Sequence, residues 1–240
     1  MTAFKARGLV LREYEAGESD KRIMLLCKSH GRIMVYARGA RKQNSKFMAV
    51  SQLLTYGDYI IADGKQFLSL TQAEVIESFY AIRQDYDKLC HAGYVLEICE
   101  KTIPERTNCD EILRLALKTI QHINGEVIAP KLAVHVFLFR FFLINGIAPE
   151  MDCCCICGGD LNSSGLFCYE GMICHSCRGP KGMPLSLAAQ EGVRHILKSD
   201  MNKTFLFRAG EAVINEIVLA ALLCWTNHFS VSLNTDKLIH

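Results

Sequence analysis

The feature that most constrains this chain is a pair of C-x-x-C motifs, Cys154 to Cys157 and Cys174 to Cys177, separated by sixteen residues. Each motif forms a tight turn that places two sulfurs about 3.5 to 4 Å apart, so two facing turns offer four ligands at about 2.3 Å from a zinc ion. The nearby Gly158, Gly159 and Gly171 let the backbone curl and direct its amides at the sulfurs. The spacing therefore predicts a tetrahedral zinc site.

Other uses of these cysteines stay open. The ligands that we expect are Cys154, Cys157, Cys174 and Cys177. Cys153 or Cys155 could replace a ligand of the first motif, and His175 could replace a thiolate of the second. A redox pair, a disulfide framework and free core thiols are the alternatives. We expect no disulfides, because the N-terminal residues lack an apolar signal segment and thiols stay reduced in the cytoplasm.

Four protein ligands would close the coordination sphere of the metal. No position is then left for a water or a substrate, so we expect the zinc to be structural. It would stabilise a small module, residues 150–181, which has too few apolar side chains to fold unaided.

The first 78 residues predict a small β-barrel. Five short segments are rich in β-branched and aromatic residues and partly alternate in polarity, as strands do: 4–14, 22–28, 32–37, 53–62 and 67–75. The Asp63-Gly64 pair between the last two favours a tight hairpin. A closed barrel such as the OB-fold leaves no exposed strand edges, and an SH3-like barrel fits the pattern nearly as well.

Basic charge is concentrated between the third and fourth predicted strands. The chain has 27 basic and 25 acidic side chains, yet residues 31–57 contain five basic ones and no carboxylate. Four of the five lie in a predicted surface loop: Arg38, Arg41, Lys42 and Lys46. Such a loop can bind nucleic-acid phosphates, or it can be an ordinary solvated loop. Tyr36, Phe47 and Tyr56 could stack on bases, although aromatic side chains are more often part of a core.

Beyond residue 78 the apolar period changes from two to 3.6, which predicts helices over 85–101, 111–124, 187–198 and 210–229, together with one that Pro130 begins and Gly146 ends. The helix after Pro130 is apolar nearly all round and should lie at the centre of a second core. Arg140 within it needs a carboxylate partner or a route to the surface. The polar residues and the short length of this helix argue against a membrane span.

We therefore predict an α+β protein of three parts. An OB-like domain covers 1–78, an α-helical domain covers 79–149 and 182–240, and the zinc module covers 150–181. No nucleotide-binding, serine-hydrolase or zinc-protease motif is found, which favours a non-enzyme.

This order of parts resembles the RecO family of bacterial recombination and repair mediators. The matching stretches read GLVLREY at 8–14, ESD at 18–20, GR at 31–32, ARGARK at 37–42, GIAP at 146–149, CCICG at 154–158, CHSC at 174–177 and PLS at 184–186. Together they span nearly the whole chain.

The resemblance implies a non-enzymatic cytoplasmic protein of the bacterial nucleoid that binds single- and double-stranded DNA and anneals complementary strands. With its partner RecR it would help load RecA onto DNA coated by single-stranded DNA-binding protein. Arg38, Arg41, Lys42 and Lys46 would contact phosphates, with Arg32, Arg7 and Arg12 as weaker candidates. The acidic tail of the coating protein would enter an apolar pocket of the helical domain, where Arg140 or Lys131 could pair with its carboxylate.

Two other functions stay open. A metal-dependent nuclease would need carboxylates such as Asp58, Asp63, Glu74 and Glu77 to converge on one cation. A zinc-ribbon transcription or translation factor would carry its basic residues on the zinc module, where only Arg178 and Lys181 follow the second motif.

Overall fold

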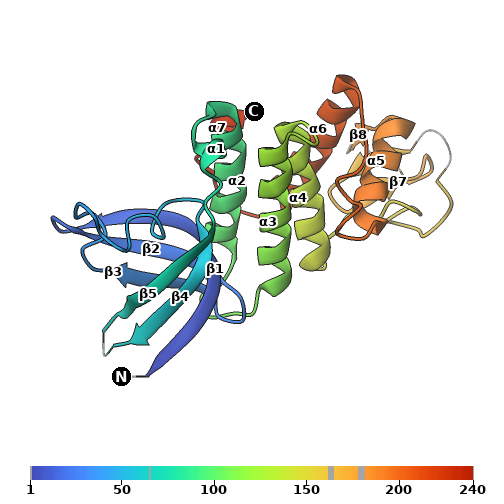
Figure 1. The fold of residues 1–240 in the computed structure, drawn as a ribbon. Coiled ribbons are helices and arrows are strands. Elements are labelled where there is room, and N and C mark those ends of the chain that lie inside the picture. The colour runs from blue at the N-terminus through green and yellow to red at the C-terminus, as the bar shows by residue number, and fades with distance from the viewer. Residues whose placement is uncertain (1, 65, 162–164, 178–181, 240) are drawn as a thin grey trace. The chain divides into compact units, whose positions relative to one another are not determined.

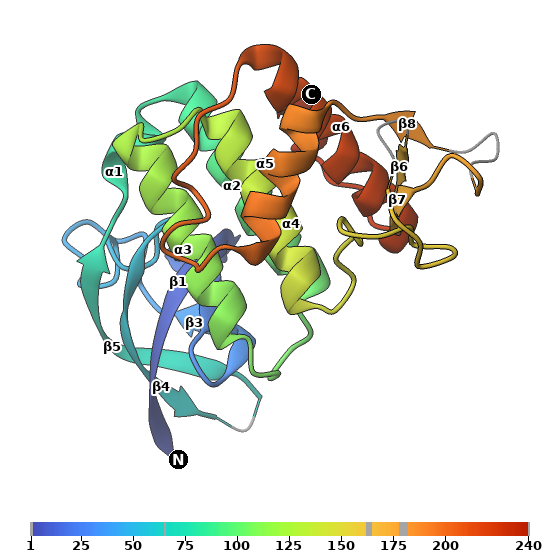
Figure 2. The ribbon, with the colours of Figure 1, turned by 90° about the vertical axis from the view of Figure 1, so that its right-hand side faces the viewer.

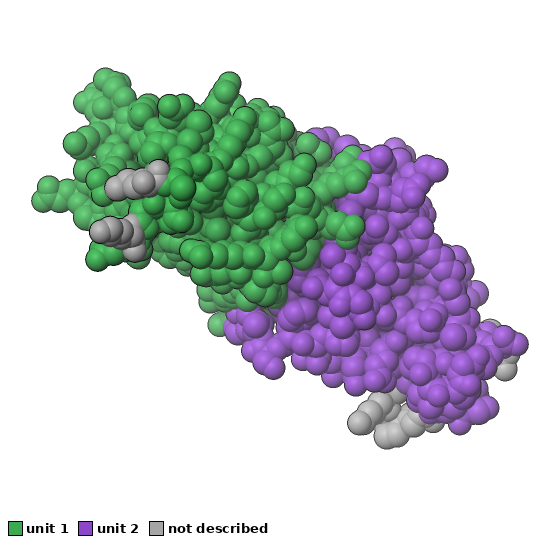
Figure 3. Space-filling model, turned by 90° about the horizontal axis from the view of Figure 1, so that it is seen from below, with its two compact units in different colours: residues 1–124, 233–240 green, residues 125–232 purple. Residues whose placement is uncertain are grey.

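The computed structural model describes residues 2–64, 66–161, 165–177 and 182–239, so Arg178 and Lys181 lie outside the described residues. The chain divides into two compact units, residues 1–124 with 233–240 and residues 125–232 (Figure 3). Each unit is a group of residues that pack more closely with one another than with the rest of the chain. The domain limits at residues 78 and 150 stay a prediction.

Five strands form a closed barrel in the first unit (Figure 1): β1 (Ala3–Ala16), β2 (Asp20–Cys27), β3 (Gly31–Ala37), β4 (Tyr56–Asp63) and β5 (Leu68–Glu77). Their order is β1-β2-β3-β5-β4, and β4 pairs with β1 to close the barrel. Buried and less buried residues alternate along β3 and β4, so one face of each strand fills the interior. The structure confirms the predicted five-stranded, OB-like barrel.

The segment between β3 and β4 is a succession of turns that packs against the barrel. Ala40, Phe47 and Val50 are buried in the barrel core, and the Tyr59 hydroxyl donates to the Val50 carbonyl at 3.0 Å. Phe47 is therefore a core residue. The predicted start of a strand at residue 53 is wrong, because residues 53–55 lie outside the strand and β4 begins at Tyr56.

The turns before β4 hydrogen-bond to β1 next to a β-bulge. The pairing of β1 with β2 shifts register between Val10 and Arg12, and Val10, which pairs with Leu25, bonds to these turns through its own backbone groups. Its N–H donates to the Thr55 carbonyl at 2.9 Å, and its carbonyl accepts from the Leu54 N–H at 3.1 Å. Residues 54 and 55 thus satisfy backbone groups of β1, as buried polar groups require.

The barrel is followed in the chain by α1 (Tyr80–Arg83), α2 (Tyr86–Thr102) and α3 (Asp110–Gly125). The C-terminal helix α7 (Asp236–Ile239) also belongs to the first unit. The Asp85 side chain accepts from the Lys88 N–H and begins α2. The two long helices confirm the predicted period. The two short ones were not predicted, because four residues are too few to show a repeat of 3.6.

The second unit packs α4 (Pro130–Ile144), α5 (Leu187–Lys198) and α6 (Glu211–His228) against one another. A small sheet of β6 (Leu166–Cys168), β7 (Gly171–Ile173) and β8 (Met183–Pro184) lies beside α6 (Figure 2). Pro130 begins α4 as predicted, and Gly146, with a φ of 71°, follows its end. The Ser186 side chain accepts from the Ala189 N–H and caps the start of α5. None of the described helices combines the length and apolarity of a bilayer span.

Candidate nucleic-acid interface and metal centre

Four sulfurs converge in the second unit. The Sγ atoms of Cys154, Cys157, Cys174 and Cys177 all lie within 4.8 Å of one another. The Cys157 and Cys174 sulfurs are 3.9 Å apart, close to the separation of about 3.8 Å that two ligands have at 2.3 Å from a tetrahedral zinc. The structure thus brings together the predicted ligand set, which is able to hold a metal ion. We call it the four-cysteine cluster.

The backbone holds these sulfurs in place. The first motif is a tight turn in which the Gly158 N–H donates to the Cys154 carbonyl at 2.8 Å. The Cys174 amide donates to the Cys154 sulfur at 3.3 Å, as we expected for amides that moderate thiolate charge. Gly171 is required at the hairpin of β6 and β7, because its φ is 138° and a Cβ there would lie 2.2 Å from the Glu150 carbonyl oxygen.

The electrostatics of the cluster suit a cation. Backbone N–H groups of Cys174, Cys157 and Ile156 that donate to its sulfur lower the pKa of Cys154 to about 6. Hydrogen bonds with neighbouring cysteine sulfurs instead raise the pKa of Cys177 to about 12. A divalent cation at the centre stabilises all four thiolates at once, so the donor set fits a metal of the zinc type.

The alternative ligands lie outside this cluster. Among the described residues, neither Cys153 nor His175 belongs to a metal-ligating group, and His175 is exposed. Cys155 instead lies with Cys168 and Glu170 in a second group. Sequence reasoning missed Cys168, because it belongs to no C-x-x-C motif and only the β6–β7 hairpin brings it near Cys155.

Four basic side chains are exposed along the turns between β3 and β4. We call Arg38, Arg41, Lys42 and Lys46 the basic segment. The Gly39 N–H donates to the Asp20 carboxylate at 2.7 Å and the Arg41 N–H donates to the Ser19 carbonyl at 2.9 Å, which fixes its start beside the β1–β2 loop. The Lys46 ammonium donates to the Thr71 carbonyl of β5 at 3.1 Å, which fixes its end. The segment therefore holds its charges in a defined place on the barrel.

Most of this charge remains available for a ligand. Arg41 pairs with Glu15 at 3.1 Å, but the Glu15 side chain is 74% exposed, and such pairs are weak. Within the described part of the chain, Arg38 and Lys42 have no carboxylate within ion-pair distance, and both are exposed. A polyanion could bind these side chains without first breaking a strong ion pair.

A groove on β2 and β3 adds arginines and aromatic rings. It is lined by Arg22, Arg32, Tyr36, Phe67 and Arg106, among others. The Tyr36 and Phe67 rings lie 5.6 Å apart, and Phe67 is 58% exposed. Strands 2 and 3 form the ligand face of many OB-folds. We expected roles for Arg32 and Tyr36, but Arg22, Phe67 and Arg106 were missed.

Arg7 is held by a carboxylate. Its guanidinium donates to both oxygens of Asp58, at 2.8 and 2.9 Å, and Lys5 lies 3.4 Å from the same group. The hydrogen bond from Arg7 lowers the pKa of Asp58 to about 2. A phosphate at Arg7 would have to compete with this carboxylate.

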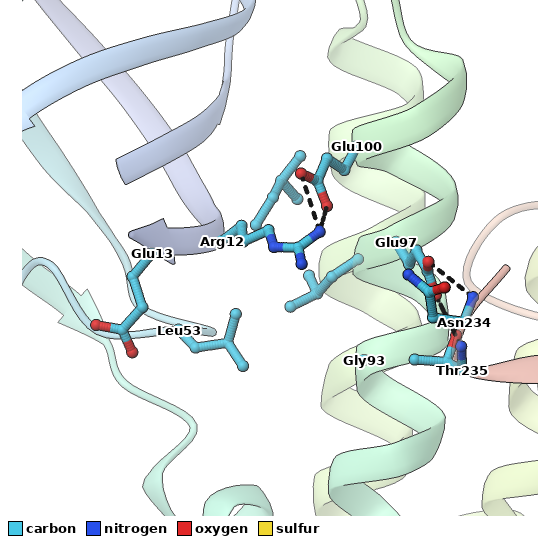
Figure 4. Close-up of a pocket in the computed structure, with 10 residues that line it drawn as sticks. Arg12, Glu13, Leu53, Gly93, Glu97, Glu100, Asn234 and Thr235 are labelled. Atoms are coloured by element: carbon cyan, nitrogen blue, oxygen red, sulfur yellow. Dashed lines mark hydrogen bonds and ion pairs between the residues drawn. The ribbon is translucent and has the colours of Figure 1, made fainter. Parts of the chain in front are cut away.

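Arg12 serves the packing of the barrel on α2. Its guanidinium lies 3.1 Å from Glu100 (Figure 4). The Glu100 carboxylate also accepts from the Tyr14 hydroxyl at 2.8 Å. Arg12, Glu100 and Leu53 line a cavity of about 280 Å³. A phosphate role for Arg12 is thus a weaker prediction than one for the basic segment.

The same cavity is bordered by an anchor for the C-terminal segment (Figure 4). The Glu97 carboxylate accepts from the N–H groups of Asn234 and Thr235, both at 2.9 Å, and from the Lys101 ammonium at 2.7 Å. Burial would raise the pKa of Glu97, but these hydrogen bonds outweigh burial and lower the pKa to about 2. This anchor follows from no sequence motif.

Arg140 and Lys131 both have bonds within the second unit. The Arg140 guanidinium donates to carbonyls of Ile196, Leu197 and Ser199 at the C-terminal end of α5, the nearest at 2.9 Å. A cation there complements the helix dipole. The Lys131 ammonium donates to the Asn215 side chain at 2.9 Å.

The carboxylates of a nuclease do not converge. Asp58 faces Glu74 across β4 and β5, but Asp58 is bound to Arg7. Among the described residues, both potential metal-binding groups consist of residues of the second unit, and neither includes Asp58, Asp63, Glu74 or Glu77.

Comparisons with known proteins agree with this architecture. Residues 1–79 match the family model "Recombination protein O N terminal", and residues 83–235 match "Recombination protein O C terminal". The chain is 31% identical over 221 residues to DNA repair protein RecO of Acetivibrio thermocellus, covering 90% of this chain and 88% of the relative. It is 33% identical over 205 residues to the protein of the same name from Bacillus pumilus, covering 83% and 78%. The chain therefore belongs to the RecO family of DNA repair proteins.

Proposed function

We propose that this chain is a non-enzymatic recombination mediator of the bacterial cytoplasm that binds single- and double-stranded DNA and anneals complementary strands. With RecR it would help load RecA onto DNA coated by single-stranded DNA-binding protein. The observation that carries the proposal is the basic segment, held on a closed barrel in a chain of the RecO family.

The proposed mechanism is electrostatic. Two complementary strands repel each other because both are polyanions, and cations on a protein surface lower that repulsion. Phosphate contacts position a strand without reading its bases, so base edges stay free to pair with a second strand. Binding should accordingly have low sequence preference. The exposed Phe67 beside Tyr36 would add stacking with single-stranded bases.

A groove on α3 supports the binding of an acidic peptide. It has a volume of about 440 Å³, within the range of known ligand pockets. Leu113 and Leu117 provide apolar lining. Lys28, Arg114 and Lys118 provide positive charge that exceeds the negative charge of Asp110, which also lines the groove. This combination suits the acidic, phenylalanine-ending tail of single-stranded DNA-binding protein better than Arg140 or Lys131 does, since those two are bonded elsewhere.

The four-cysteine cluster would hold one structural zinc. A bound zinc would cross-link the two motifs through four protein ligands. Its coordination sphere would then have no open position for chemistry. Its role would be to keep the loop-rich part of the second unit folded, which is compatible with DNA binding by the barrel of the first unit.

Charge reversal in the basic segment tests the DNA-binding proposal. We expect Arg38→Glu/Arg41→Glu/Lys42→Glu to weaken binding to every sequence and to flatten the slope of log affinity against log salt by about 2 to 3, because each lost phosphate contact removes about 0.7 to 0.9. Fluorescence anisotropy over a salt series measures both quantities.

The matched control changes the same total charge elsewhere. Lys203, Arg208 and Lys237 are exposed and lie outside the barrel, so Lys203→Glu/Arg208→Glu/Lys237→Glu should keep most of the affinity and the slope. Equal losses in the two triple variants would mean that overall charge, and not the basic segment, determines binding. An unchanged salt slope in the first variant would exclude the segment as the DNA track.

A further inference from the structure

A second set of metal-ligating atoms lies close to the four-cysteine cluster without sharing any residue with it. The Cys155 and Cys168 sulfurs are 3.9 Å apart, and a carboxylate oxygen of Glu170 lies within 4.8 Å of both. This sulfur separation equals the one between Cys157 and Cys174. It again matches the distance of about 3.8 Å between two thiolates on one tetrahedral zinc.

The backbone fixes all three donors. The Cys155 N–H donates to the Met172 carbonyl of β7 at 2.9 Å, which holds Cys155 beside the hairpin. Cys168 pairs with Gly171 where β6 turns into β7, so Glu170 lies in the turn directly after Cys168. The Cys224 thiol of α6 lies 3.6 Å from the Tyr169 carbonyl and fixes the same turn from the helix side. The fold thus brings the three donors together at one turn.

We infer that Cys155, Cys168 and Glu170 form a second zinc site. Two thiolates and one carboxylate offer three anionic donors to a dication, and thiolates favour zinc over magnesium or calcium. Three protein ligands leave the fourth position of a tetrahedral zinc to water. The second metal should therefore be held less tightly than a metal in the four-cysteine cluster and should be removed first by a chelator. This site goes beyond the proposed DNA function, which does not require it.

Cobalt(II) is a suitable probe because its thiolate complexes absorb light in proportion to the number of bound sulfurs. The full chain, stripped of metal under reducing and oxygen-free conditions, is titrated with cobalt(II). We expect two equivalents to bind, the first with four thiolates and the second with two. The Cys155→Ser/Cys168→Ser variant should bind one equivalent and keep the absorbance of the first.

Two further variants control for misfolding. Cys153 is a neighbouring cysteine outside both groups, so Cys153→Ser should still bind two equivalents. Glu170 is exposed, so Glu170→Gln should fold normally, and it should weaken the second equivalent by at least about tenfold without changing the first.

Binding of one equivalent by the unaltered chain, with no change in Cys155→Ser/Cys168→Ser, would overturn the second site and leave the four-cysteine site intact. A second equivalent that survives in that variant would equally overturn the assignment of these residues. No cobalt binding at all would overturn both metal sites, and the DNA-binding proposal would be unaffected.

Discussion

A basic side chain on this barrel is available to DNA only to the extent that no carboxylate already holds it. Arg7 is bound by both oxygens of Asp58, and Arg12 is bound by Glu100. Arg38 and Lys42 are exposed and have no such partner among the described residues. The amino-acid composition does not show this difference, because it counts all four side chains simply as basic residues. We therefore expect the contributions of single arginines to DNA binding to differ widely.

Phe67 provides a residue-level test of stacking. Its ring is 58% exposed and lies 5.6 Å from that of Tyr36 in the arginine-lined groove. We expect Phe67→Ala to weaken binding of single-stranded DNA by about 1 to 3 kcal/mol, the usual contribution of one stacked base, with the salt slope unchanged. Anisotropy with a short single strand measures the loss.

Tyr86 offers a matched control for Phe67. It is an aromatic residue at the start of α2, is 73% exposed and lies outside the groove. Tyr86→Ala should leave DNA affinity unchanged. If Phe67→Ala binds as tightly as Tyr86→Ala, or loses equal affinity for duplex and single strand, the groove does not stack bases.

Glu97 provides a test by pH. Its pKa in the folded protein is about 2, below the ordinary value of 4.5, so its contribution to stability is fully present above pH 4.5 and is lost as the pH falls toward 2. We expect Glu97→Gln to lower the free energy of unfolding by about 2 kcal/mol at pH 7 and by about 1 kcal/mol at pH 3, as measured by urea denaturation.

The exposed Glu18 in the β1–β2 loop is a suitable comparison, and Glu18→Gln should change little at either pH. The same loss of stability at pH 7 and at pH 3 in Glu97→Gln would contradict the account, because the anchor would then not depend on the ionised carboxylate.

At the scale of elements, the smallest ones position the metal ligands. The strands β6 and β7 have three residues each, and their hairpin carries Cys168 at one end and Cys174 just beyond the other. Elements this short bury little apolar surface and depend on cross-links for stability. A metal in the four-cysteine cluster would provide that cross-link.

Loss of the four-cysteine cluster should therefore destabilise the second unit. We expect Cys154→Ser/Cys177→Ser to lose its tightly bound zinc and to melt at a temperature lower by several degrees, while DNA affinity stays near that of the unaltered chain. Zinc content by elemental analysis and thermal melts by circular dichroism are the measurements. Cys153→Ser is the control, and a double variant that keeps its full zinc content would show that other residues bind the metal.

The elements that the sequence predicted are those with long, regular patterns. The barrel strands and the helices α2 to α6 each repeat their apolar residues often enough to be recognised, and the caps at Asp85 and Ser186 follow known preferences. The turns before β4 were mistaken for part of a strand. Leu53 and Leu54 have strand-like residue types, but Leu54 and Thr55 bond to Val10 of β1 outside the regular ladder, which begins at Tyr56.

The candidate sites divide in the same way. Local spacing predicted the four-cysteine cluster and the basic segment, because both lie in short stretches of chain. Cys168, Arg22 and Arg106 were missed because each reaches its site only through strand pairing or a long-range contact. Similarly, the partners of Arg7 and Arg12 are 51 and 88 residues away in the sequence. Such pairings need the three-dimensional fold.

At the scale of the whole molecule, net charge says little about DNA binding. The chain carries a formal charge of only +2, so the proposed attraction to DNA would come from the local concentration of cations and not from the total. Affinity should then fall steeply with salt although the protein is nearly neutral. A surface that binds phosphate weakly at several points can also release the duplex once the bases have paired.

Annealing of two complementary oligonucleotides, followed by fluorescence over a salt series without Mg²⁺ or nucleotide, tests the central claim most directly. One arm uses naked strands, and the other uses strands coated with the cognate single-stranded DNA-binding protein. The account predicts faster annealing in both arms, with an effect that declines as salt rises. Acceleration of naked strands alone would contradict the proposed binding of the acidic tail. No acceleration in either arm, or strand cleavage once Mg²⁺ is added, would contradict the mediator function itself.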